Sequence, residues 1–412
     1  MVTDFKKLYQ EEAEEQRARY EQLRAGFAEQ FSDADGIEFF SAPGRTEIGG
    51  NHTDHNHGHV LAGAVNLDIA AAARRTEGGQ ILLKSYEYPG MDVVDLSDLS
   101  LREEETGSSA SVIRGICARC RELGFTVGGM EAFTISRVLK GSGLSSSAAF
   151  EVAVVTMISE LYNDGGIDPV TAAMIAQYAE NVYFGKPSGL LDQMASSMGG
   201  VTAMDFKDTA HPVVEHIDFD LHSYGHALCV VDTGGNHADL TDEYAYIPQE
   251  MKSVARFFGK EFLREVDPEE FRSRIGEVRK VTGDRAVLRA MHFFDDDRRA
   301  VEEADAIKAG DFERFKELIN QSGDSSETRL QNVFATVNPA EQGLSLALAL
   351  SKKLLKGEGA CRVHGGGFAG TIQAFVPLNR LADYKSEIEK VFGKDSCYVL
   401  SIRFVGGTKV TF

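Results

Sequence analysis

Residues 140–149, KGSGLSSSAA, follow an apolar strand-like run at 133–138 and lead into an apolar, helix-length stretch at 148–162. Closely spaced glycines let backbone N–H groups approach a ligand, because no Cβ stands in the way. The serines fall where a helix begins, and there the free N–H groups and the positive end of the helix dipole favour an anion. The pattern predicts a phosphate-binding loop. It is not a P-loop, since no Gly-Lys-Ser/Thr closes it, and a serine-capped helix after a flexible turn is the alternative.

A dense polar segment, SAPGRTEIGGNHTDHN at 41–56, follows an earlier apolar run. The guanidinium of Arg45 can fork to a carboxylate or a phosphate. Asp54 and His52 can bind a polyol through paired hydrogen bonds. Four histidines at 52, 55, 57 and 59 beside Asp54 also permit a metal site, although alternating histidines in a loop are more often hydrogen-bonded or solvated.

Two acids twelve residues apart, Glu180 and Asp192, flank the sequence KPSG. A helix over 171–184 must end near Lys186, since Pro187 disfavours helix in the residue before it. A carboxylate on that helix can hold Mg²⁺, which prefers hard oxygen ligands and substrate phosphates. An acid of either kind, taken alone, is more often an ordinary surface charge than part of a site.

Four glycines lie within residues 363–371, VHGGGFAGT, ahead of an apolar strand. This pattern indicates either a tight hairpin or close backbone packing against a ligand or against the glycine loop at 140–149.

Bulk composition excludes several classes of protein. The chain has 412 residues and a formal net charge of −20, which argues against nucleic-acid or anionic-membrane partners but leaves ATP binding open. The N-terminus is charged, and apolar runs stay shorter than about 18 residues, so we expect a soluble, cytoplasmic protein. The acidic surface favours a monomer. Five cysteines form no disulfide framework, and Cys117 and Cys120 are expected to be buried thiols.

Strand-like and helix-like segments are mixed rather than strictly alternating, which predicts an α+β fold and not a doubly wound sheet. The glycine pair at 78–79 predicts a hairpin between 65–71 and 80–86. The most marked break in composition lies near residues 200–212. Other strands are expected at 37–42, 212–219, 227–231, 368–376 and 397–404, and helices at 3–30, 248–320 and 340–355.

Taken together, the four motif segments resemble the galactokinase branch of the GHMP kinase superfamily, in order and across most of the chain. The resemblance implies a GHMP kinase fold. Its ribosomal-protein-S5-like N-terminal domain would cover residues 1–208 and its ferredoxin-like C-terminal domain residues 209–412, with the active site between them. It implies phosphorylation of the anomeric C1 hydroxyl of galactose, with ATP as co-substrate and Mg²⁺.

The resemblance also assigns roles. Asp192 matches the catalytic aspartate, and Arg45 the arginine that offsets charge and keeps this aspartate ionised. Ser147 and Glu180 match the magnesium ligands. The ATP-binding positions are Gly141, Ser142, Gly143, Leu144, Ser145, Ser146 and Ser147. The sugar-binding positions are Asn51, His52, Asp54, Gly189 and Tyr244.

Several positions depart from the family pattern. Glu47 and Asn51 exchange the family's amide and acid, and the acid often contacts the exocyclic 6-hydroxyl of the sugar. An amide at 51 tolerates a C6 carboxylate better, so galacturonate, L-arabinose or an amino sugar is the alternative acceptor. His55 replaces a tyrosine. The chain has no tryptophan, and Ser109 lies near the position of the tryptophan that often packs by adenine. A non-catalytic sugar sensor is the remaining alternative, against which the complete serine loop and both acids argue.

Overall fold

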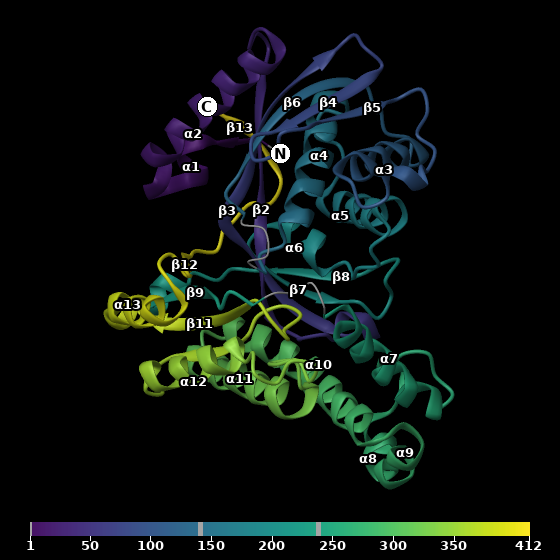
Figure 1. Ribbon diagram of the computed structural model, residues 1–412, viewed down its shortest axis with the longest axis vertical. Coiled ribbons are helices and arrows are strands. Elements are labelled where there is room, and N and C mark those ends of the chain that lie inside the picture. The colour runs from purple at the N-terminus through teal and green to yellow at the C-terminus, as the bar shows by residue number, and fades with distance from the viewer. Residues whose placement is uncertain (1, 139–142, 236–239) are drawn as a thin grey trace.

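The computed structural model describes residues 2–138, 143–235 and 240–412. A mixed sheet of nine strands occupies the upper half of Figure 1, with the order β1-β13-β2-β3-β6-β4-β5, and β7 and β8 continue from the start of β3. The bounds of these strands are β1 Val2–Asp4, β2 Glu38–Gly49, β3 His59–Thr76, β4 Gln80–Ser85, β5 Met91–Asp95, β6 Gly129–Ser136, β7 Val201–Asp205, β8 Val213–Ile217 and β13 Thr408–Thr411.

Helices cover both faces of this sheet because β3 is apolar on both sides. Ala71 and Ala73 face one core, and Ala70 and Ala72 face the other, as the two-residue period of a strand requires. The first core is covered by α3 Ser109–Glu122, α4 Ser146–Tyr162 and α5 Pro169–Tyr178, with α6 Leu191–Met198 beside them. The second core is covered by α1 Phe5–Tyr9 and α2 Ala13–Phe31.

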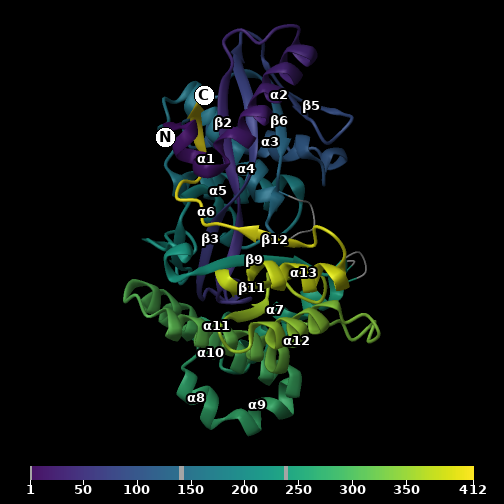
Figure 2. The ribbon, with the colours of Figure 1, turned by 90° about the vertical axis from the view of Figure 1, so that its left-hand side faces the viewer.

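A second, antiparallel sheet with the order β10-β11-β9-β12 lies below the first (Figure 2). Its strands are β9 His226–Asp232, β10 Ala360–Val363, β11 Thr371–Pro377 and β12 Cys397–Leu400. Apolar residues of α12 Gly343–Leu355 and α13 Leu381–Phe392 pack on one face, and α11 Phe312–Ser325 packs on the other. The long helix α10 Asp284–Lys308 continues to a third core with α7 Thr241–Phe257, α8 Pro268–Ser273 and α9 Ile275–Thr282.

Short helical turns complete the architecture, and two of them, η4 and η7, are π-helical. They are η1 Gln10–Glu12, η2 Asp54–Asn56, η3 Glu103–Glu105, η4 Ala179–Phe184, η5 Leu221–Tyr224, η6 Leu263–Glu265, η7 Ser326–Leu330 and η8 Leu378–Arg380.

The predicted α+β class is confirmed, and Cys117 and Cys120 are buried thiols as expected. None of the described helices is long and apolar enough to span a membrane. The predicted hairpin between β3 and β4 is wrong, because β6 lies between them and pairs with both. The large sheet also takes β8 and β13 from beyond residue 208, so the chain crosses between the two halves more than once.

One buried carboxylate, Asp68 on β3, joins both ends of the chain to the large sheet. It accepts hydrogen bonds from Arg19 Nη2 at 2.7 Å, Tyr9 Oη at 2.6 Å and Arg403 Nη1 at 3.2 Å, and a further one from Ser41 Oγ. Burial raises the pKa of Asp68, but the two arginines and the hydroxyl donors outweigh it and lower the pKa to about 2.

We expect Asp68→Asn to lower the free energy of unfolding by about 3–5 kcal/mol, since two buried guanidinium groups lose their counter-charge. Because the folded-state pKa is lowered to about 2, this stabilisation is complete above the unfolded pKa of about 3.9 and is lost as the pH falls towards 2. Urea unfolding at pH 7 and pH 3 measures both effects, with the exposed Asp218→Asn as control. Equal stability of wild type and Asp68→Asn at pH 7 would contradict the prediction.

Candidate active site

An ion pair between Arg45 and Asp192 lies at the centre of the predicted site. Arg45 Nε donates to Asp192 Oδ1 at 2.7 Å and Arg45 Nη2 to Oδ2 at 2.9 Å, a bidentate pair. Arg45 belongs to β2, which the sequence had predicted to end at residue 42 but which continues through a register shift after Pro43. Its Nη1 donates to the Gly143 carbonyl, and its backbone N–H donates to the Leu144 carbonyl at 3.0 Å. The strand therefore joins Asp192 to the glycine loop.

Asp192 is ionised at neutral pH. Burial raises its pKa, but the charge and hydrogen bonds of Arg45 and a hydrogen bond from Ser145 hold the pKa below its ordinary value. Ser145 Oγ donates to Asp192 Oδ2 at 2.6 Å, so this hydroxyl, at the N-cap position of α4, does not cap the helix. Ser145 has a left-handed φ of 56°, a conformation that costs free energy in a residue with a side chain.

The glycine loop packs against the glycine-rich segment near the C-terminus. Gly143 has φ 73°, and a Cβ there would lie 2.5 Å from Thr371 Oγ1 and 3.0 Å from His364 Nδ1. Both alternatives for residues 363–371 apply, because the segment connects the antiparallel pair β10–β11 as a hairpin loop and also packs against the first loop. The predicted ATP-binding positions Gly141 and Ser142 lie outside the described residues. Leu144 is buried, and Ser146 and Ser147 open α4, where the first amides have no acceptor within the helix.

Glu180 lies in the π-helical turn η4 and is 3% exposed. Its carboxylate accepts from Lys186 Nζ at 2.9 Å, Ser188 Oγ at 2.5 Å and Gln193 Nε2 at 2.8 Å. Gln193 Nε2 also donates to Glu151 at 2.9 Å, and burial, followed by the charge of Glu180, raises the pKa of Glu151 well above its usual range. The charge of Lys186 also lowers the pKa of Asp192, which places both acids in one electrostatic neighbourhood.

This donor set fits a magnesium ion. Within the described ranges, no three His, Cys, Asp or Glu side chains form a group that could hold a metal ion. Magnesium, however, uses one or two carboxylates together with phosphate oxygens and water. The predicted ligands, the Glu180 carboxylate and the exposed hydroxyl of Ser147 at the start of α4, are hard oxygen donors of this kind.

Asp54 and Gly189 are in contact although 135 residues separate them in the sequence. A Cβ on Gly189 would lie 2.1 Å from Asp54 Oδ2, so position 189 has no space for a side chain. His52 lies nearby in the sequence and has φ 60°. Its Nε2 lies 3.0 Å from the Gly366 carbonyl, which only accepts, so Nε2 carries the proton and Nδ1 is an acceptor. Burial, with the charge of His55, lowers the pKa of His52 to about 4, which keeps the ring neutral.

Asn51 is completely buried, so its side chain lies inside the protein. Its Nδ2 donates to Glu47 Oε1 at 2.9 Å and to the Gly365 carbonyl at 2.8 Å. Its Oδ1 accepts from Asn332 at 3.0 Å and from Ser326 at 3.3 Å. All the hydrogen-bonding positions of the amide are therefore used within the protein, and a contact between Asn51 and a sugar stays a prediction.

The polar segment 41–56 is also held by Arg362 and His364, two residues that the sequence analysis did not single out. Arg362 is completely buried and donates to Glu47 Oε1 and to the Ile48 carbonyl, both at 2.7 Å. His364 Nε2 accepts from the Glu47 backbone N–H at 3.3 Å, and burial lowers the pKa of His364 well below its usual range. Their positions next to the glycines were the only available signal.

Tyr244 lies against the same glycine segment. Its hydroxyl donates to the Gly367 carbonyl at 2.7 Å, and a Cβ on Gly366 would lie 2.7 Å from its ring. Burial raises the pKa of Tyr244 to about 12.

Two of the histidines considered as metal ligands have other partners. The His57 ring stacks on the Phe262 ring with a centroid distance of 3.7 Å, and His59 Nδ1 lies 3.0 Å from Asp297 Oδ1.

Comparison with known proteins gives one consistent result. Residues 25–75 match a family model described as the galactokinase galactose-binding signature, and residues 107–200 match the GHMP kinases N terminal domain. The chain is 29% identical over 377 residues to a galactokinase of Mannheimia succiniciproducens, covering 89% of this chain and 92% of that protein.

Solved structures agree in fold. The chain resembles Lactococcus lactis galactokinase complexed with galactose with a TM-score of 0.80 and 24% identity, covering 95% of this chain and 100% of that one. A mevalonate kinase of Methanococcus jannaschii gives a TM-score of 0.64 at 14% identity, covering 89% and 99% of the two chains. The matched family segments contain Arg45 and Asp54 in one case, and Glu180 and Asp192 in the other.

Proposed function

The chain belongs to the galactokinase branch of the GHMP kinase superfamily, and we propose that it transfers the γ-phosphoryl group of ATP to the anomeric C1 hydroxyl of galactose, giving galactose 1-phosphate. The observation that carries this proposal is the Arg45–Asp192 pair, which lies beside the start of α4. Gly189, three residues before Asp192, contacts Asp54. An ionised acid thus lies next to the predicted phosphate cradle.

Asp192 accepts or orients the proton of the C1 hydroxyl as the oxygen attacks the γ-phosphorus. Arg45 keeps this carboxylate ionised and offsets negative charge that builds up in the transition state. Phosphoryl transfer depends on position and charge more than on covalent chemistry, so a rigid bidentate pair suits the reaction.

The amides at the start of α4 and the backbone of Gly143 to Ser147 would hold the β- and γ-phosphates. Ser147 and Glu180 would hold Mg²⁺, which when bound supplies further neutralisation of phosphate charge. Lys186, which pairs with Glu180 at 2.9 Å, would add a further positive charge beside the proposed metal ligands.

The sugar would bind beside Asp54 and the loop before α6. Asp54 and the Nδ1 of neutral His52 are acceptors for sugar hydroxyl groups, and Gly189 lets this loop approach Asp54 closely. Tyr244 holds the glycine segment that carries the carbonyl partner of His52. We retain the division into domains at 1–208 and 209–412 as a proposal.

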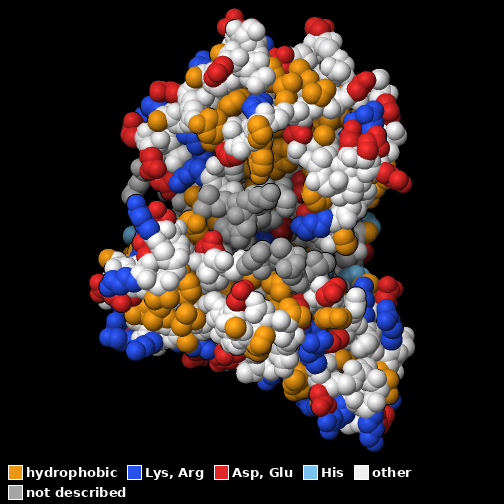
Figure 3. Space-filling view, viewed as in Figure 1, with side chains coloured by type: hydrophobic (Ala, Val, Ile, Leu, Met, Phe, Trp, Pro, Cys, Tyr) orange, Lys and Arg blue, Asp and Glu red, His pale blue; other side chains and the backbone are white. Residues whose placement is uncertain are grey.

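We also propose that the enzyme works as a monomer in the cytoplasm. A net charge of −20 keeps copies apart and supports solubility. Acidic and basic side chains are interspersed over the face seen in Figure 3, as on the surfaces of soluble enzymes.

The direct test is release of ADP from ATP and magnesium with galactose, galacturonate, L-arabinose and N-acetylgalactosamine as acceptors. We expect kcat/KM for galactose to exceed that for the others by at least about 10-fold, because a pocket of fixed polar groups loses hydrogen bonds with each altered hydroxyl. Release of ADP with none of the sugars would contradict a sugar kinase. A preference for galacturonate would instead change the acceptor and leave the reaction class intact.

A further inference from the structure

Glu303 on α10 is fully buried, and neither of its carboxyl oxygens has a hydrogen-bond partner among the described residues. Buried polar groups without partners are uncommon, because such a group loses its hydrogen bonds to water on folding and gains none in the protein. The known chemistry of the site does not use this residue. Its position therefore requires a physical explanation.

The carboxyl group of Glu303 is pressed against the backbone of Gly49, at the end of β2. A Cβ on Gly49 would lie 1.7 Å from Glu303 Oε2 and 2.8 Å from Glu303 Cδ, distances at which atoms overlap. The φ angle of Gly49 is outside the left-handed region, so the space taken by Glu303, and not the backbone conformation, is what requires a glycine there. The next residue, Gly50, has φ 81° and needs glycine for its backbone.

The charges around Glu303 balance only when it is neutral. It faces two acids, Asp296 on α10 and Glu47 on β2, and two cations, Arg299 on α10 and Arg362 on β10. Ionised Glu303 would add a third negative charge to a buried group that holds two positive ones. Burial, with the charge of Asp296, raises the pKa of Glu303 well above its usual range in spite of the two arginines.

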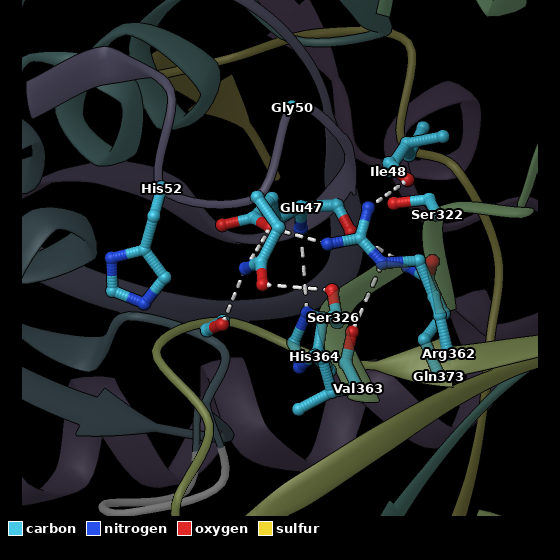
Figure 4. Close-up of polar contacts among 12 residues, drawn as sticks. Glu47, Ile48, Gly50, His52, Ser322, Ser326, Arg362, Val363, His364 and Gln373 are labelled. Atoms are coloured by element: carbon cyan, nitrogen blue, oxygen red, sulfur yellow. Dashed lines mark hydrogen bonds and ion pairs between the residues drawn. The ribbon is translucent and has the colours of Figure 1, made fainter. Parts of the chain in front are cut away.

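The residues on either side of Gly49 are also held by the C-terminal half of the chain. Arg362 donates to the Ile48 carbonyl at 2.7 Å (Figure 4), and the Asn51 N–H donates to Asp296 Oδ2 at 2.8 Å. Three residues further on, the segment reaches Asp54 of the proposed sugar site. Glu303 thus lies against Gly49, the first of the two glycines between these two anchors.

We propose that Glu303 is a positioning residue that sets the sugar-binding segment 49–54 against the C-terminal half of the chain. Its carboxyl acts as a neutral wedge on Gly49 and fixes the place of His52 and Asp54 relative to Asp192. The kinetic consequence rests on the proposed sugar kinase function, whereas the contact itself does not.

A double-mutant cycle tests the wedge. Gly49→Ala is expected to raise the galactose KM by at least about 10-fold and to leave the ATP KM within about 2-fold, because a small displacement of the binding groups is costly. Gly49→Ala combined with Glu303→Ala is expected to return the galactose KM to within about 3-fold of Glu303→Ala alone, since the overlap is removed. Gly50→Ala is the control: its Cβ would meet the His59 carbonyl at 2.4 Å, so Glu303→Ala is not expected to rescue it.

Thermal unfolding without any substrate gives a second, independent measurement. The double variant is expected to unfold at a higher temperature than Gly49→Ala, and Glu303→Gln, which is uncharged at every pH, is expected to keep the wild-type galactose KM. If wild type phosphorylates no sugar, the proposed function fails, but the thermal rescue still reports on the wedge. A double variant no better than Gly49→Ala in both measurements, or a 10-fold higher KM for Glu303→Gln, would overturn the proposal.

Discussion

Asp192→Asn is expected to lower kcat for galactose phosphorylation by at least about 100-fold while the protein folds and binds both substrates. The amide keeps the shape of the carboxylate but cannot accept the proton of the C1 hydroxyl, and general-base groups contribute about 10²–10⁴-fold. An asparagine oxygen in the place of Oδ2 still accepts from Ser145 Oγ and Arg45 Nη2, and these two contacts hold the loop close to its place. Initial rates of ADP release give kcat, and calorimetric titration with galactose gives the affinity.

The larger change, Asp192→Ala, should show the same loss of kcat, because both variants lack the carboxylate. Asp208→Asn, an exposed acid of the same half of the chain, serves as the matched control and is expected to have wild-type kinetics. Turnover of Asp192→Asn within about 3-fold of wild type would remove Asp192 from the reaction. A loss of galactose affinity with unchanged kcat would make it a binding group instead.

The local signals in the sequence predicted the parts of the site that depend on neighbours in the chain. The serines after Gly143 and the apolar run that follows them indicate a helix start, and α4 begins at Ser146. The family resemblance placed Arg45 and Asp192 together, and their side chains form the bidentate pair. These predictions succeed because cap chemistry and hydrophobic periodicity are set by residues close in sequence.

Pairing between distant segments could not be predicted in the same way. The glycines before β4 suggested a hairpin with β3, but β6, from later in the chain, takes the place between them. The edge strand β1 has only three residues, too few for a two-residue period to be recognised. Strand order in a sheet depends on packing of the whole domain rather than on the sequence of any one strand.

The inward direction of Asn51 has the same origin. A polar residue in a polar loop is expected to face solvent or ligand, and the sequence between residues 41 and 56 contains nothing that says otherwise. Its buried partners from the C-terminal half, Ser326, Asn332 and the Gly365 carbonyl, come from distant parts of the sequence. The same holds for Glu303, whose contact with Gly49 joins residues 254 positions apart.

The ion pair gives a second test with a large expected effect. Arg45→Met is expected to lower kcat by about 10²–10³-fold, since removing one preorganised donor of transition-state charge stabilisation costs that much. The change also leaves Asp192 without its bidentate partner. Arg45→Lys keeps the positive charge but not the fork, so we expect an intermediate loss. Steady-state rates at saturating galactose and ATP measure the three enzymes side by side.

The pH profile separates the effect of Arg45 on Asp192 from its effect on the phosphoryl group. In wild type the pKa of Asp192 is lowered, so its ionised form, and with it kcat/KM, persists below the ordinary pKa of an aspartate, about 3.9. In Arg45→Met, burial still raises the pKa of Asp192 but the positive charge that lowers it is gone. The acid limb of kcat/KM is therefore expected to move up by about 1–3 pH units. An unmoved limb together with a large loss of kcat would mean that Arg45 acts on the transition state alone. If the acid limb of the pH profile moves up in Arg45→Met and returns in Arg45→Lys, the titrating group is Asp192. Two guanidinium nitrogens of Arg45, Nε and Nη2, donate to that carboxylate.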